Sequence, residues 1–180
     1  MELKISTEQM LKILYVISWI IFIGVCNEAG SFIFNALFTL FINQDNADFF
    51  KLSDLYKYDS GYFSVVILFM SIVAVMRSII FYLIVKILHD KKLNMAQPFN
   101  KEIGSFLFNV SYLSLGIGLF SNWGVNYTDW FIGQGVKMPD IQHLRLGGAD
   151  VWLFMGVTLF VIAHIFKRGI EIQSENELTI

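Results

Sequence analysis

The sequence contains little of what catalytic and metal sites usually require. Cys26 is the only cysteine in 180 residues. An intramolecular disulfide is therefore excluded, and we expect this side chain to pack as a small apolar group. The three histidines, His89, His143 and His164, are not expected to meet, because the first two fall in opposite loops, so no zinc site is predicted. A glycine-rich phosphate loop and a nucleophile with an evident base are also missing. We expect no enzymatic activity, no metal and no cofactor.

What the chain has in quantity is apolar surface. Hydrophobic residues make up 56% of the chain, which includes 18 phenylalanines, and the mean hydropathy is +0.60. A soluble core of this size would not bury so much apolar surface. The length allows one domain, and a bundle of membrane-spanning helices uses such a composition best.

Four apolar runs are long enough to cross about 30 Å of hydrocarbon as helices. Asp59 and Asn100 precede two of them and are suitable N-caps. The sequence therefore predicts an all-α, polytopic membrane protein with four transmembrane helices in one bundle. The expected spans are residues 10–30, 61–86, 103–123 and 151–166.

The first span leaves two questions open. Residues 31–42 are too short to cross the membrane alone, so they either continue the first helix, kinked near Gly30, or lie in the interface. We favour the continuation. The start of the chain has the shape of a signal peptide, but Val25 stands where a lipoprotein box before Cys26 needs a small residue. We expect an uncleaved membrane anchor.

The loops differ in charge and set the orientation. By the positive-inside rule, the side of the membrane with the basic residues is the cytoplasm. Both termini are therefore predicted to be cytoplasmic, in a multi-pass protein of the inner membrane. The basic residues on that side are Lys4, Lys12, Lys86, Lys91, Lys92, Lys101, Lys167 and Arg168.

Polar residues inside the spans are candidates for function, because charge in hydrocarbon is costly. Arg77 precedes Lys86 by roughly 13 Å of helix rise, too deep for an ordinary interfacial residue. Glu28 is the obvious counter-ion, but the span boundaries place it roughly 12 Å away in depth. The two either pair or extend to opposite headgroup layers. Asn109 and His164 are further candidates, for which helix or interface packing is the plainer explanation.

The third span also contains small residues with helical spacing. Ser114 and Gly118 are four residues apart, which lets two helix backbones approach closely. We expect this face to pack against another helix.

The end of the chain carries a family resemblance. Residues 162–169 read IAHIFKRG, and the acidic residues 170–180 follow them. This pattern resembles the ending of a bacterial family of four-helix membrane proteins catalogued as domain of unknown function 2975. Residues 97–100, Gln-Pro-Phe-Asn, are similar to the family's entry into the third helix, although Thr or Ser is more usual at Asn100. The resemblance implies a membrane protein without an assigned activity, whose gene often neighbours a helix-turn-helix regulator.

The acidic tail, residues 170–180, supplies the partner-docking candidates Glu171, Glu175, Glu177 and Leu178. They form either a solvated tail or a segment that orders on a basic, partly apolar partner. The leading hypothesis is a membrane sensor or regulator. It would bind a lipid or another hydrophobic ligand and act on a cytoplasmic partner such as a helix-turn-helix regulator, without binding nucleic acid itself. The alternative is a small transporter or channel, for instance a homo-oligomer, with a polar path near Arg77 and Glu28.

Overall fold

The computed structural model describes residues 7–90 and 100–177, which form helices joined by turns and one longer linker. Four of these helices are long and apolar enough to cross a membrane. The predicted all-α fold with four spanning helices is confirmed. The elements are α1 (Thr7–Phe41), the 3-10 helix η1 (Gln44–Phe50), α2 (Ser53–Tyr58), α3 (Ser60–His89), α4 (Lys101–Gly133) and α5 (Ala149–Glu177).

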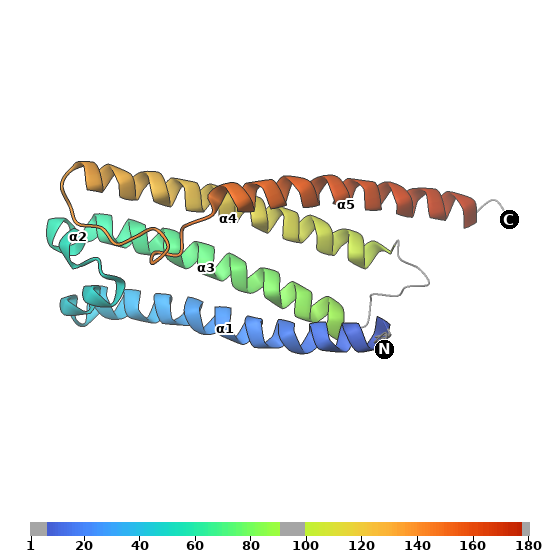
Figure 1. Ribbon diagram of the computed structural model, residues 1–180, viewed down its shortest axis with the longest axis horizontal. Helices are drawn as coiled ribbons and strands as arrows, with labels where there is room; N and C mark the ends of the chain where they lie inside the picture. Colours follow the sequence, from blue (N-terminus) through green and yellow to red (C-terminus); the bar gives the residue numbers. More distant parts are fainter. Residues whose placement is uncertain (1–6, 91–99, 178–180) are drawn as a thin grey trace, which may run out of the picture.

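The four long helices lie side by side in chain order (Figure 1). Within the described ranges, α1 packs on α3, α3 on α4 and α4 on α5, and α1 makes no backbone approach to α4 or α5. The outer helices are correspondingly exposed: 6% of the most apolar segment of α1 and 11% of that of α5 is buried, against 39% in α3 and in α4. The bundle is therefore an open row whose two edge helices face lipid.

The predicted helix starts are present. Oδ1 of Asp59 accepts hydrogen bonds from the backbone N–H of Gly61 at 2.7 Å and of Tyr62 at 3.1 Å. Oδ1 of Asn100 accepts from the N–H of Ile103 at 2.8 Å. Each cap satisfies donors that the first helical turn leaves without intrahelical partners.

Residues 31–41 continue the first helix, so the interfacial alternative is wrong. α1 passes Gly30 without interruption and ends at Phe41. Asn46 of η1 fixes this far end, because its Nδ2 donates to the backbone oxygen of Asn35 at 3.2 Å and to Oγ1 of Thr39 at 3.0 Å. The chain turn after Phe41 is thus bonded back onto α1.

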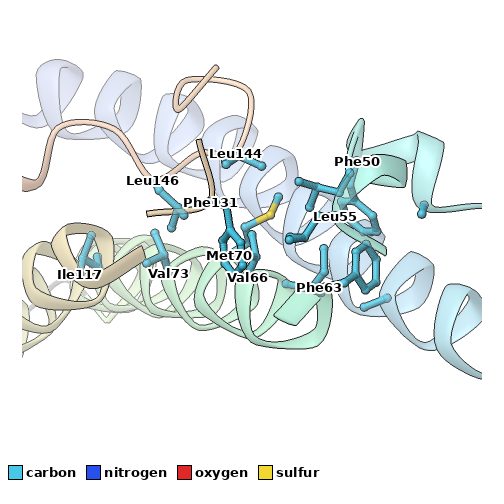
Figure 2. Packing of buried hydrophobic residues seen from close by; sticks show 14 of the residues in the cluster. Phe50, Leu55, Phe63, Val66, Met70, Val73, Ile117, Phe131, Leu144 and Leu146 are labelled. Carbon is cyan, nitrogen blue, oxygen red and sulfur yellow. The ribbon is translucent and has the colours of Figure 1, made fainter. Parts of the chain in front are cut away.

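The two ends of the molecule differ in packing. We call the end formed by η1, α2 and the last turns of α1 and α4 the cap end. Its core contains the fully buried Phe50, Leu55, Phe63 and Phe131 (Figure 2). We call the opposite end the basic end, since Lys12, Lys86, Lys101, Lys167 and Arg168 lie there. Thr7 and Glu177 are both at the basic end (Figure 1).

The linker between α4 and α5, residues 134–148, folds back from the cap end into the bundle (Figure 1). Leu144 and Leu146 are completely buried. A Cβ atom built on Gly124 would lie 2.7 Å from Cδ1 of Leu146, so the linker packs directly on the α4 backbone. As a result, α5 begins beside the middle part of α4 instead of at its end.

Small residues allow α4 and α5 to approach closely, as the spacing of Ser114 and Gly118 predicts. A Cβ on Gly118 would lie 3.0 Å from the backbone nitrogen of Leu153, and one on Gly156 would lie 2.8 Å from that of Leu115. Backbone atoms cannot move aside as a flexible side chain can, so larger residues here would separate the helices.

Candidate functional site, an intramembrane charge cluster

Glu28 and Arg77 lie at nearly the same depth in the bundle. Oγ of Ser78 donates to the backbone oxygen of Val25 at 3.1 Å, and the hydroxyl of Tyr15 lies 2.9 Å from Nδ1 of His89. In this antiparallel register Glu28 faces the turn of α3 just before Arg77, within roughly 3 Å of helix rise. The predicted offset was therefore wrong, because α1 continues past Gly30 and its register against α3 brings Glu28 to the level of Arg77.

The partner of Glu28 is Arg145 of the linker, and not Arg77. Nε of Arg145 lies 2.8 Å from Oε1 of Glu28. The Glu28 side chain is 30% exposed and that of Arg145 59% exposed, so the pair lies at the edge of the bundle. Oε1 is buried and accepts no well-directed hydrogen bond from the described residues. The contact is thus an ion pair with capacity for a further donor.

Arg77 lies under the first turn of α5. Its guanidinium carbon is 5.5 Å from the ring centroid of Trp152, within the range of a cation–π interaction. Its Nε is buried and has no hydrogen-bond partner among the described residues. Leu153 packs beside Gly118 and Met76 beside Gly116, so Trp152 is nearer the cap end than Arg77 is. The Arg77 side chain therefore extends away from Lys86. This differs from the alternative in which Arg77 reaches the headgroup layer on the side of Lys86.

We call Glu28, Arg77, Arg145 and Trp152 the charge cluster. It joins four segments, since Glu28 belongs to α1, Arg77 to α3, Arg145 to the linker and Trp152 to α5. One carboxylate and two guanidinium groups leave an excess positive charge beside the middle of α3. Such a cluster can hold helices together, bind an anion or respond to the loss of one charge. Among the described residues, no group of three potential metal-ligating side chains is present.

The sequence analysis missed Arg145, which lies between the third and fourth expected spans. Two signals were available. Leu144 and Leu146 flank Arg145 in an alternation typical of a half-buried segment, and two glycines follow. The backbone of Arg145 adopts a φ of 57° and that of Gly148 a φ of 78°. The left-handed conformation costs a non-glycine residue roughly 1 kcal/mol of conformational energy. The packing of the linker must offset this cost to hold Arg145 in place.

The other two intramembrane candidates lie apart from the charge cluster. Asn109 is exposed and lines a pocket between α3 and α4 near Lys86. His164 is also exposed, with its ring centroid 5.2 Å from that of Phe108 and 4.7 Å from that of Phe160. The contacts of His164 are those of a packing residue.

The comparison with protein families gives one match. The family model described as "Protein of unknown function (DUF2975)" matches residues 47–180. The chain belongs to this family. No curated protein and no solved structure matches it. The match to DUF2975 includes Arg77, Arg145, Trp152 and the tail, whereas Glu28 precedes it.

The four docking candidates, Glu171, Glu175, Glu177 and Leu178, lie within the part of the chain that the family model matches. Glu171 and Glu175 are part of α5, which continues to Glu177, and Leu178 lies outside the described residues. Nη1 of Arg168 donates to Oε2 of Glu171 at 3.0 Å. The first part of the tail is therefore a helical continuation of α5.

Proposed function

We propose that the protein is a non-enzymatic membrane sensor or regulator that couples the charge cluster to a cytoplasmic partner through α5. The observation that carries this proposal is the continuity of α5 from Ala149 to Glu177. Trp152, in its first turn, lies on Arg77. A Cβ on Gly104 would meet Ile170, so the residues that follow Ile170 extend beyond the start of α4 (Figure 1). One helix thus links the middle of the bundle to a protruding acidic end.

The packing of α5 supports a transmitting role. Among the long helices, its backbone approaches only α4, and it does so across the glycines Gly104, Gly118 and Gly156. The side chains of Leu153, Leu115 and Ile170 lie over these glycines, so α5 is held close along α4, and a displacement of its start would be carried along the helix. Further restraints on the start of α5 include Trp152 on Arg77 and the linker pairing of Arg145 with Glu28. A change in these restraints would alter the position of the acidic end.

The protruding end has the chemistry of a docking surface. Glu171 and Glu175 are one helical turn apart and face the same side, and Ile172 is 46% exposed. A basic and partly apolar surface complements this pattern. A helix-turn-helix regulator, the partner that the family resemblance implies, is the kind of protein we propose, in the cytoplasm at the inner membrane of a bacterium.

This role requires that the basic end face the cytoplasm. The positive-inside rule gives that orientation, because the lysines at this end adjoin the membrane ends of all four helices. Reporter fusions after Ile180 and within residues 44–57 should therefore report opposite compartments, with the first in the cytoplasm. Activity of both reporters in one compartment would contradict the topology.

Removal of the acidic end should abolish binding of the partner. We expect a truncation after Ile170 to lose the partner in a pull-down from native membranes, because an exposed ion pair alone contributes about 0 to 1 kcal/mol and docking needs the apolar contacts too. Membrane insertion should be unchanged. Glu8→Gln, at the same end of the bundle, is the control. Recovery of the same proteins with the full-length and the truncated chain would contradict the regulator proposal.

A transporter or channel is the second candidate, because Glu28, Arg77 and Arg145 lie at one depth and Oε1 of Glu28 lacks a well-directed donor. Charged groups inside a membrane often mark ion pathways. The truncation after Ile170 separates the two candidates. Transport in proteoliposomes would persist without the acidic end, and regulation would not.

A further inference from the structure

A pocket lies between α3 and α4 at the basic end. It has a volume of about 320 Å³ and lies in the groove between the two helices. Residues 83, 86, 87 and 90 of α3 and residues 101, 102, 105, 106 and 109 of α4 line it. Each set has the spacing of one helical stripe, so two continuous stripes face each other across the groove.

The charges around the pocket are balanced. Lys86 and Lys101 contribute two ammonium groups, and Asp90 and Glu102 contribute two carboxylates. Lys101 and Glu102 are also the first residues of α4, so the positive end of its dipole is at the pocket mouth. Leu83 and Phe106 provide apolar walls deeper in the groove. Mixed charge at the mouth and apolar walls below match an amphiphile whose headgroup carries both signs.

The side chain of Asn109 favours a phospholipid as the ligand of this pocket. It is exposed in the groove about two helical turns deeper than Lys101, roughly 12 Å along α4. None of the hydrogen bonds identified among residues 7–90 and 100–177 involves its side chain. An exposed amide at hydrocarbon depth is costly unless a polar group meets it. The ester groups of a phospholipid lie directly below its phosphate and would supply the acceptors.

We propose that this pocket binds a phospholipid whose headgroup carries a phosphate and a primary amine. Lys86 and Lys101 bind the phosphate, Asp90 accepts hydrogen bonds from the ammonium group, and Asn109 contacts the glycerol esters. A primary ammonium donates three hydrogen bonds, whereas a trimethylated headgroup donates none. The pocket therefore distinguishes phosphatidylethanolamine from phosphatidylcholine. The idea that this lipid is the signal that the protein senses rests on the proposed function, whereas the binding of the lipid does not.

The test is lipid binding to the purified full-length protein in detergent, followed by native mass spectrometry without any cytoplasmic partner. We expect phosphatidylethanolamine to be retained about tenfold more than phosphatidylcholine of the same chain length, the ratio given by one charge-assisted hydrogen bond. Phosphatidylglycerol tests whether negative charge alone suffices. Phosphoethanolamine in solution tests whether the headgroup without chains is the ligand.

Substitutions of the pocket residues test which side chain contacts the phosphate and which contacts the ammonium group. The double variant Lys86→Gln/Lys101→Gln should lose about tenfold of the phosphatidylethanolamine binding, and Asp90→Asn should bind the ethanolamine and choline lipids equally. Lys12→Gln/Lys167→Gln removes the same charge from the basic end outside the pocket and should bind as the wild type does. Equal retention of the ethanolamine and choline lipids by the wild type, a preference for phosphatidylglycerol, displacement by phosphoethanolamine, or an equal loss in the control variant would each overturn the proposal. Because no partner is present, failure here leaves the tail truncation as the separate test of regulation.

Discussion

Glu28→Gln is expected to lower the free energy of unfolding by about 3 kcal/mol, one of the two largest effects we predict. The substitution removes the carboxylate that lies 2.8 Å from Arg145. Two guanidinium groups then remain at the same depth without an opposite charge. Reversible unfolding in lipid bicelles, followed by steric trapping or by a denaturing detergent, measures the change.

Removal of the second charge should reverse much of this loss. In Glu28→Gln/Arg145→Gln the uncompensated cation of the linker is gone, so we expect more than half of the lost stability to return. Glu8→Gln, on an exposed turn at the start of α1, should change stability by less than about 0.5 kcal/mol. Equal losses in the single and the double variant would show that the two residues do not form an ion pair that matters for stability.

The second large effect concerns the linker. Leu146→Ala should lower the free energy of unfolding by about 2 to 4 kcal/mol, because Leu146 is completely buried against Gly124 and the alanine leaves a cavity. Val151→Ala is the matched control, since Val151 is 63% exposed and loses little packing.

Leu146→Ala should also weaken the contact between Arg145 of the linker and Glu28 of α1. Once Leu146 no longer holds the linker, Arg145→Gln should cost less than about 0.5 kcal/mol in the Leu146→Ala background. Strict additivity of the two substitutions would mean that Arg145 reaches Glu28 without the linker being docked, which would contradict the structure.

The sequence was sufficient for the four spanning helices but not for their full lengths or for the register between them. Apolar runs and the caps Asp59 and Asn100 predicted four spans and their starts, because these signals are local. The depth of Glu28 was judged from a boundary at Gly30, whereas the contacts of Val25 with Ser78 fix it. Register between helices depends on side-chain packing, which a hydropathy pattern does not encode.

The linker and the tail were misjudged for different reasons. The polar, glycine-containing linker has the composition of an exposed loop, and only the burial of Leu144 and Leu146 reveals that it enters the bundle. The fourth expected span ends at residue 166, where the apolar pattern gives way to charged residues, although a glycine such as Gly169 ends a helix only where it takes a positive φ. Among the described glycines only Gly135 and Gly148 have a positive φ, and α5 runs through Gly169.

The central claim is that the charge cluster controls the position of the acidic end of α5. The direct measurement is the distance between spin labels at Lys12→Cys on α1 and Ser174→Cys on α5, in lipid nanodiscs and with the exposed Cys26 replaced by serine. The account predicts that Glu28→Gln shifts or broadens this distance distribution, and that Glu8→Gln leaves it as in the parent. An unchanged distribution in folded Glu28→Gln protein would contradict the coupling.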